Sequence, residues 1–244
     1  MRKALCGRDT PSFFMLRFAL AAVLAAHATS PAARSVDTGR HRVIAAEIIV
    51  LPPPRIAGPM SLEETLNRRH SVREFLDKPI SLGDVSQLLW AAQGISHEER
   101  LRTAPSAGAL YPLALYLVGG DIVSLPSGVY RYLPHRHRLK VLRRGDFRAD
   151  LAAAAMHQDW MKDSAAILVF AGVEERPTAK YGIRGRDYVH MEAGHAAQNV
   201  LLQAVALGLG GTPVGAFNDE WSANVLDLPE KEKPLYLVPI GKPR

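Results

Sequence analysis

The sequence predicts an α+β fold, in which strands and helices follow one another without regular alternation. Short stretches at 128–133 and 139–142 are typical of a β-hairpin, because each is rich in strand-forming residues and they are joined through turn residues. A long apolar stretch at 191–209 is typical of a helix instead. Because both kinds of element are mixed and a hairpin is present, α+β is favoured over a doubly wound parallel sheet.

The composition is that of an ordinary globular protein. The chain has 244 residues, of which 48% are hydrophobic and 22% are charged, which suits one domain or two small ones. The net charge is +6, but the basic residues are scattered and mixed with acidic ones, which argues against a nucleic-acid partner. Cys6 is the only cysteine, so the sequence predicts neither an internal disulfide framework nor a cysteine-based metal site.

The first 28 residues have the pattern of a signal peptide. Basic residues come first, an apolar run follows at 18–26, and Ala26-His27-Ala28 is a candidate cleavage site. The run is shorter than the about 20 residues that cross a membrane, so no stable span is expected. We therefore expect a signal peptide at 1–28 and an exported, periplasmic protein. The alternative is a disordered N-terminus and a cytoplasmic protein.

A linker and an extended arm are expected at 29–57, ahead of the main domain at 58–244. Residues 29–41 are mostly small and polar, as in a linker. Residues 43–51 are apolar and β-branched and are stopped by Pro52-Pro53-Pro54. We interpret this stretch as an extended arm rather than a core strand, because proline cannot continue a central strand.

Two helices are expected at the start of the main domain. The run Ser61–Glu64 is a capping box and predicts a helix to about Arg69. Ser81 begins a second helix, and Gly94 is its expected end. The apolar face of the second helix is formed by Val85, Leu88, Leu89 and Ala92.

The later part of the chain supplies the remaining elements. The long helix at 191–209 has almost no polar face, so we expect it to be buried centrally or at a subunit interface. The other expected elements are a loop at 105–112, a strand at 113–118, the hairpin, a helix at 146–156, a strand at 165–172, a loop at 212–217, a helix near 219–226 and a strand at 235–240.

Several kinds of catalytic site have no pattern in this sequence. None of the nine histidines has H-E-x-x-H spacing, so no metal site is expected. His190 and His195 are five residues apart on different helix faces and are expected to be structural. There is no G-x-S-x-G elbow, and the glycine clusters form neither a P-loop nor a Rossmann turn.

The residues that remain indicate a phosphate site and a flat ligand. Arg69, Ser71 and Arg73 would share one side of an extended chain, and arginine suits bidentate binding of phosphate. The alternative is a solvated basic patch. The small residues at 105–112 and 212–217 allow close approach of a ring to backbone amides. A flavin, with its phosphate at the arginines and its ring between the loops, fits this arrangement.

Five motifs in order resemble the FMN-binding nitroreductase family, in the form of its SagB/ThcOx-type dehydrogenase branch. The resemblance covers about residues 58–244. The first motif resembles the R-x-S-x-[RK]-x-F pattern that opens the family. The motifs are Arg69-His70-Ser71-Val72-Arg73-Glu74-Phe75, Ala104–Pro112, Glu192–Asn199 running to Gly208-Leu209-Gly210, Pro213–Phe217 and Gly241-Lys242-Pro243.

The resemblance implies a nitroreductase-like α+β fold, with a mostly antiparallel central sheet flanked by helices. It also implies a homodimer with two FMN sites at the subunit interface. By the same resemblance, Arg69, Ser71 and Arg73 would hold the FMN phosphate and ribityl chain, and His70 would lie against the pyrimidine side. Lys242 would return to the phosphate, with an exposed tail position as the alternative.

The two loops are implied to surround the flavin ring. Pro105, Ser106 and Ala107 would come from the partner subunit and line the ring. In the loop that begins at Pro213, Gly215 and Ala216 would offer backbone to the flavin near N5.

The implied activity is that of an FMN-dependent oxidoreductase, which transfers hydride through flavin N5 between a reductant such as NAD(P)H and a small organic substrate. Azoline-oxidising members of the branch use a Lys-Tyr pair in proton removal, and Lys180-Tyr181 has a comparable position ahead of the central helix. An exposed lysine beside a packing tyrosine is the alternative. Two other functions stay open: a thiazoline or oxazoline dehydrogenase that acts on heterocyclised peptides, and a catalytically idle flavin-binding protein.

Overall fold

A computed structural model of the chain describes residues 47–97 and 101–244. The predicted signal peptide at 1–28 and the predicted linker that follows it lie outside the described residues.

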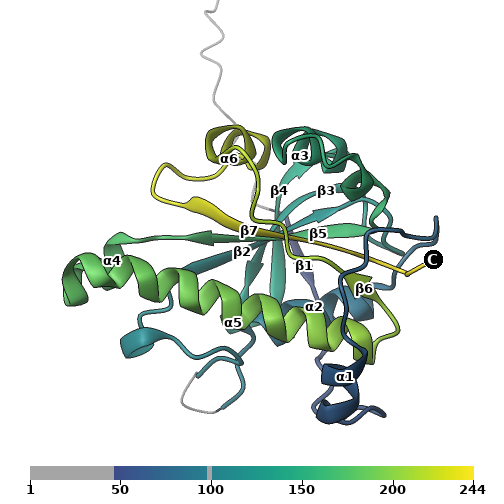
Figure 1. Ribbon diagram of the computed structural model, residues 1–244, viewed down its shortest axis with the longest axis horizontal. Helices are drawn as coiled ribbons and strands as arrows, with labels where there is room; N and C mark the ends of the chain where they lie inside the picture. The colour runs from purple at the N-terminus through teal and green to yellow at the C-terminus, as the bar shows by residue number, and fades with distance from the viewer. Residues whose placement is uncertain (1–46, 98–100) are drawn as a thin grey trace, which may run out of the picture. The chain divides into compact units, whose positions relative to one another are not determined.

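A seven-stranded antiparallel sheet forms the centre of the fold (Figure 1), which confirms the predicted α+β class. The strand order is β1-β4-β3-β2-β5-β7-β6, and every neighbouring pair is antiparallel. The strands are β1 (Ile48–Val50), β2 (Leu113–Gly119), β3 (Gly128–Leu133), β4 (Arg138–Arg144), β5 (Ala166–Gly172), β6 (Gly210–Gly211) and β7 (Lys233–Gly241).

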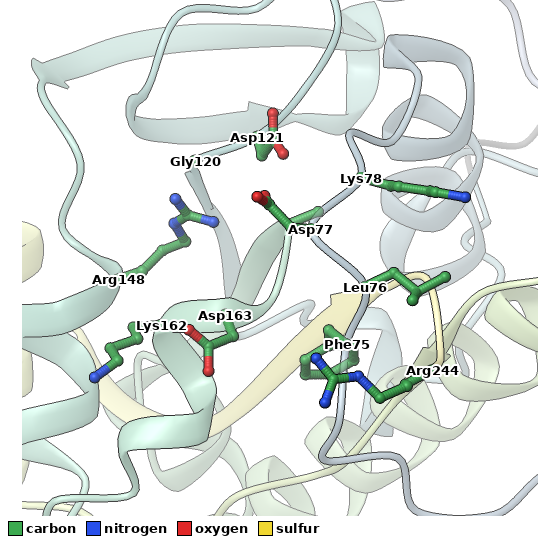
Figure 2. A pocket seen from close by; sticks show the side chains of 11 residues that line it. Phe75, Leu76, Asp77, Lys78, Gly120, Asp121, Arg148, Lys162, Asp163 and Arg244 are labelled. Carbon is green, nitrogen blue, oxygen red and sulfur yellow. The ribbon is translucent and has the colours of Figure 1, made fainter.

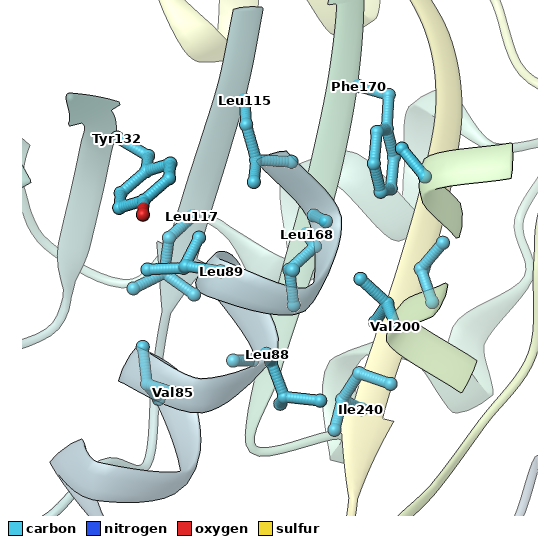
Figure 3. Packing of buried hydrophobic residues seen from close by; sticks show 14 of the residues in the cluster. Val85, Leu88, Leu89, Leu115, Leu117, Tyr132, Leu168, Phe170, Val200 and Ile240 are labelled. Carbon is cyan, nitrogen blue, oxygen red and sulfur yellow. The ribbon is translucent and has the colours of Figure 1, made fainter. Parts of the chain in front are cut away.

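Helices cover both faces of this sheet. The helices α2 (Leu82–Gln93) and α5 (Gly185–Ala206) pack on one face, and α3 (Arg148–Ala154) and α6 (Asp219–Leu226) pack on the other. Alternate residues of β2 therefore enter different cores: Leu115 and Leu117 face α2, whereas Tyr116 faces the opposite side. Figure 3 shows the leucines of α2 packed against those of β2.

The predicted helix starts are confirmed by their caps. The Ser61 side chain accepts a hydrogen bond from the Glu64 amide at the start of α1 (Leu62–Arg68). At the start of α2, Ser81 and Asp84 form a reciprocal capping box, which satisfies backbone donors that a helix leaves free. These two caps fix the chain on either side of the Arg69–Phe75 segment.

The long helix differs from its predicted bounds of 191–209. It is α5, Gly185–Ala206, so it begins six residues earlier and ends three residues earlier. The first turn of α5 is polar, so the apolar pattern did not indicate where the helix begins. At its end, Gly208 has a φ of 68°, which is outside the helical conformation. One face is buried against the sheet, but a stripe remains exposed. The exposed residues are Asp187, His190, Met191, Gly194, His195 and Gln198.

Two further elements refine the prediction. The helix α4 (Glu175–Tyr181) was not predicted, because Pro177 interrupts the pattern; proline is tolerated in the first turn, where no intrahelical N–H bond is lost. The extended arm contributes only the short edge strand β1, which pairs with β4. Beside β1, Leu51 is buried in the core.

Candidate cofactor site

The segment Arg69–Arg73 is held along the glycine strand β6. Ser71 forms a parallel bridge with Gly211, and the Val72 amide donates to the Gly211 carbonyl at 3.1 Å. The Thr212 hydroxyl donates to the Val72 carbonyl at 2.6 Å. These bonds fix the backbone of the predicted phosphate-binding motif on a rigid sheet edge.

The C-terminal motif lies beside the end of the same segment. The Leu76 amide donates to the Lys242 carbonyl at 2.8 Å, and the Arg244 amide donates to the Glu74 carbonyl at 3.1 Å. Phe75 and Pro243 form an antiparallel bridge between these bonds. Residues almost 170 positions apart are thereby brought together, as a shared phosphate site requires.

A cavity of about 170 Å³ opens beside these strands. Arg69 and His70 line it, together with the turn from Gly208 to Gly211 and with Pro243. Ser71 and Arg73 do not line this cavity, and the Arg73 guanidinium lies 5.9 Å from the ring centre of Trp160. The segment is joined to its neighbours by single bridges rather than a continuous strand, so its side chains do not alternate strictly.

The loop Pro213–Phe217 presents exposed backbone. Val214 exchanges two backbone hydrogen bonds with Leu237, at 2.8 and 3.0 Å, and Gln158 donates to the Ala216 carbonyl at 3.2 Å. A Cβ atom at Gly215 would find its nearest neighbour, in the Tyr236 ring, at 3.8 Å. Packing within the described chain therefore does not require glycine there. This open backbone fits a planar group that approaches it closely.

The loop at 105–112 contains strained backbone. Gly108, Ala109 and Tyr111 have φ values of 61°, 54° and 46°. The Tyr111 amide donates to the Ser106 hydroxyl oxygen at 2.9 Å, which closes the turn. Left-handed conformations of non-glycine residues cost on the order of 1–3 kcal/mol each and are found where surrounding contacts hold them, often at functional sites.

Lys180 and Tyr181 lie directly against this loop. A Cβ atom at Gly108 would lie 2.8 Å from Lys180 Nζ and 2.6 Å from Tyr181 Oη, so a side chain there would displace the ends of both side chains. The Tyr181 ring also packs edge-on against Tyr188, with 5.2 Å between ring centres. The structure thus brings the predicted Lys-Tyr pair and the Pro105–Ala107 stretch into one cluster.

The predicted site residues therefore form two groups within one protomer. One group lies along β6 and the C-terminus and contains Arg69, His70, Ser71, Arg73, Pro213, Gly215, Ala216 and Lys242. The other contains Pro105, Ser106, Ala107, Lys180 and Tyr181. Of the predicted site residues, only Arg69 and His70 of the first group line the cavity beside β6.

Sequence reasoning did not identify two residues near these groups. Trp160 contacts the first group through Arg73 and packs on Phe75, with 6.4 Å between ring centres. Glu192 lies beside the second group with only 3% of its surface exposed. Burial raises the pKa of Glu192 to about 7, while nearby Ser106, Arg102 and Gln93 act in the opposite direction. Neither was predicted as a site residue, although Glu192 begins the Glu192–Asn199 motif, because tertiary packing brings them to the site.

A larger cavity of about 710 Å³ lies on the other side of Phe75 (Figure 2). Its lining includes four basic and three acidic side chains, so its charges largely balance. Arg148 is already bound to Asp146 and to the Ser164 carbonyl. The charged residues are Asp77, Lys78, Asp121, Arg148, Lys162, Asp163 and Arg244, none of which was predicted as a site residue.

A metal-binding group and a membrane-spanning helix are both absent from residues 47–97 and 101–244. Within these ranges, no group of three or more histidine, cysteine or acidic side chains is placed to bind a metal ion. None of the helices there is long and apolar enough to cross a membrane.

The fold is that of a class of α+β proteins in which helices cover both faces of an antiparallel sheet. The chain belongs to the nitroreductase family, whose model, described as "Nitroreductase family", matches residues 66–242. The match spans every motif from Arg69 to Lys242. Membership supports an oxidoreductase function for this fold.

Individual relatives agree with this assignment. A Methanocaldococcus jannaschii protein assigned by name to the nitroreductases is 43% identical over 183 residues, which cover 75% of this chain and 91% of the relative. A crystal structure of a protein assigned to the same group from Ralstonia eutropha JMP134 has a TM-score of 0.72 at 33% identity, over 81% of this chain and 90% of that one. Another, from Anabaena variabilis ATCC 29413, has a TM-score of 0.73 at 27% identity over 82% of this chain; the chain spans only 42% of that longer protein.

Proposed function

We propose that this chain is an FMN-dependent oxidoreductase that transfers hydride between a reductant such as NAD(P)H and a small organic substrate. Nitroreductase family members typically use flavin. The observation that carries the proposal is the joining of three motifs, at Arg69–Arg73, Gly210–Ala216 and Lys242, along one sheet edge beside a cavity. Bound FMN would supply hydride acceptance and donation at N5.

The residues of the first group have distinct tasks in this proposal. Arg69, Arg73 and Lys242 supply positive charge for the phosphate, and Ser71 supplies a neutral donor. His70 lies against the pyrimidine side. Gly215 and Ala216, in the loop that begins at Pro213, offer backbone close to N5, where any side chain on Gly215 would narrow the approach.

The second group is proposed to complete the site of a partner subunit, in a homodimer with FMN at its interface. Pro105, Ser106 and Ala107 then line the ring from the opposite subunit. The separation of the two groups within one protomer supports this arrangement. Exposed apolar side chains also support it, since Met191 on α5 and Leu62 on α1 are 50% and 61% exposed.

A second candidate is an azoline dehydrogenase that acts on heterocyclised peptides. The observation that favours it is the contact of Lys180 and Tyr181 with the strained loop at Gly108. In this function Lys180 Nζ accepts a proton from the ring that is oxidised. Such a reaction needs a base close to the substrate at the flavin ring, and Lys180 lies against the loop that is proposed to line this ring.

Flavin binding is tested first. Purified protein is expected to be yellow or to take up added FMN, and R69A and R73A are each expected to weaken FMN binding about tenfold or more while far-UV circular dichroism is unchanged. R136A, at the exposed hairpin tip, is the matched control and should bind FMN as the wild type does. A colourless protein that takes up no FMN contradicts the proposal.

Turnover assays distinguish the oxidoreductase, the azoline dehydrogenase and the idle flavin-binding protein. Reduction of bound FMN by NADH or NADPH, followed by reoxidation with a small electrophile, supports the oxidoreductase. Reduction that is absent with every reductant supports an idle flavin-binding protein. Oxidation of a synthetic thiazoline peptide by the wild type but not by K180A, with FMN bound in both, supports the azoline dehydrogenase.

A further inference from the structure

The turn that follows α3 reaches the loop Pro213–Phe217. Gln158, in this turn, donates a hydrogen bond from Nε2 to the carbonyl oxygen of Ala216 at 3.2 Å. Because a carbonyl only accepts hydrogen bonds, the amide nitrogen of the Gln158 side chain faces it. Gln158 belongs to none of the five motifs. The contact therefore joins a segment without a predicted role to the backbone that is proposed to meet the flavin ring.

The backbone of residues 215–217 has few other supports. Val214 before it exchanges two hydrogen bonds with β7, and the Asn218 amide after it donates to a carbonyl of α3 at 2.8 Å. Within the described part of the chain, the bond from Gln158 is the one hydrogen bond that the backbone of 215–217 makes. This bond therefore fixes the peptide plane between the two anchors.

Two consecutive residues with left-handed backbone precede Gln158. Met156 and His157 have φ values of 55° and 57°, and both are exposed. Such conformations cost non-glycine residues on the order of 1–3 kcal/mol each and are found where surrounding contacts hold them, often at functional sites. The Gln158 amide donates to the Ala155 carbonyl at 3.2 Å, which closes the turn. The strain supports a functional role for the residue that the turn presents.

Trp160 fixes the other end of this turn. Its ring packs on Phe75, with 6.4 Å between ring centres, and lies 5.9 Å from the guanidinium carbon of Arg73. The Met161 amide donates to the Gln158 carbonyl at 3.0 Å, so Gln158 and Trp160 belong to one hydrogen-bonded turn. The turn therefore contacts the first-motif segment and the proposed ring-facing loop at the same time.

We propose that Gln158 is a positioning residue, which holds the Ala216 carbonyl and thereby orients the backbone that meets the flavin ring near N5. This inference rests on the proposed function for the part that concerns flavin. The bond itself is a property of the chain alone. It is exposed to solvent, so water competes for the carbonyl. A ring bound against the loop would displace part of that water and strengthen the bond.

A positioning role predicts different effects on FMN binding and on hydride transfer. In the proposed function, FMN affinity comes mainly from positive charges at the phosphate, which Gln158 does not supply. Hydride transfer depends on alignment instead, and a displacement of about 1 Å can cost about a hundredfold in rate. Loss of the Gln158 donor should therefore slow flavin reduction more than it weakens FMN binding.

Carbonyl ¹³C NMR of the full-length apoprotein tests the bond without flavin. The chain contains a single Ala-Phe sequence, Ala216-Phe217, so alanine labelled at its carbonyl carbon and phenylalanine labelled with ¹⁵N give one correlated signal. We expect this signal to shift in Q158L, which keeps the volume but has no donor, and in Q158A. D159N, at the exposed neighbouring position, is the control and should leave the signal in place.

Two NMR results would overturn the inference. An unchanged signal in both Q158L and Q158A shows that Gln158 does not hold the Ala216 carbonyl. A shift of the same size in D159N shows that the signal responds to any change in the turn.

Reduction of bound FMN by NADH or NADPH tests the link to the ring. We expect Q158L to be reduced about threefold to tenfold more slowly than the wild type, while its FMN dissociation constant changes by less than about twofold. D159N should match the wild type in both measurements. Equal reduction rates in Q158L and the wild type overturn the link to the ring, and so does a loss of affinity as large as the loss of rate. If the wild type binds no FMN or is not reduced, the proposed function fails, while the NMR result still decides the bond.

Discussion

Gly210→Ala should damage the fold and the cofactor site together. A Cβ atom at Gly210 would lie 2.6 Å from Cγ2 and 2.8 Å from Cβ of Val72, which is 8% exposed. Restoring ordinary contact requires a shift of at least about 0.8 Å between β6 and the Arg69–Arg73 segment. Overpacking of this kind typically costs about 1–3 kcal/mol.

The same shift displaces the arginines that the proposed function assigns to the FMN phosphate. We therefore expect G210A to lower the free energy of unfolding in urea by about 1–3 kcal/mol and to weaken FMN binding about tenfold. V72A in the same protein should restore part of both losses, because it removes Cγ1 and Cγ2 of residue 72 and leaves only the Cβ contact at 2.8 Å. A double-mutant cycle then gives a coupling energy of about 1 kcal/mol or more.

Gly215→Ala is the matched comparison. Its Cβ atom would have no described neighbour closer than 3.8 Å, so unfolding should change by less than about 0.5 kcal/mol. FMN binding should nevertheless weaken, because the proposed ring approaches this backbone. If G210A unfolds like the wild type and binds FMN equally well, the packing argument is wrong. If G215A leaves FMN affinity unchanged, the loop does not contact the ring.

Two other predictions concern parts of the fold away from the site. Glu232 is buried and accepts hydrogen bonds from Tyr116 Oη at 2.5 Å and from Arg131 Nη2 at 2.7 Å. E232Q should therefore lower the free energy of unfolding by about 2–4 kcal/mol, whereas E230Q, at an exposed position, should not. Equal urea midpoints for the wild type and both variants would refute this. Burial lowers the pKa of His137, whose ring contacts Ser86 Oγ at 2.6 Å and Tyr132 Oη at 2.8 Å. The unfolded chain then binds more protons below about pH 6.5, so stability should fall as the pH drops through that value, and thermal scans of H137N should lack this part of the pH dependence.

Local signals account for the elements that the sequence predicted well. Ser61, Ser81 and Asn218 each cap a helix through their own side chains, and α6 has its predicted bounds of 219–226. The hairpin strands follow from apolar runs on either side of a turn, where His137 takes a left-handed conformation with φ of 46°. These features depend on a few neighbouring residues, which a sequence displays directly.

The long helix α5 has two features that local sequence signals did not predict, its start and its exposed stripe. The residues 185–190 are mostly polar, and Gly185 at their start packs against α4, where a Cβ atom would lie 2.5 Å from the Pro177 backbone. That contact joins α5 to α4, which the sequence also did not reveal. The exposed stripe of α5 was not predicted for a different reason. Alanine and glycine occur on both faces of this helix, so its sequence looks apolar on every side.

The candidate site likewise combines parts that the sequence predicts with parts that depend on tertiary packing. Its backbone-binding parts were predictable, since Arg69–Arg73, Pro213–Ala216 and Lys242 are contiguous motifs whose residue types have few other uses. What shapes those parts was not predictable. Trp160 belongs to no motif, and Glu192 begins the Glu192–Asn199 motif without a predicted role. Each lies near the site through packing between elements distant in sequence. A motif therefore predicts which residues would contact a cofactor, whereas a residue packed behind it, such as Trp160 beside Arg73, is found only in the structure.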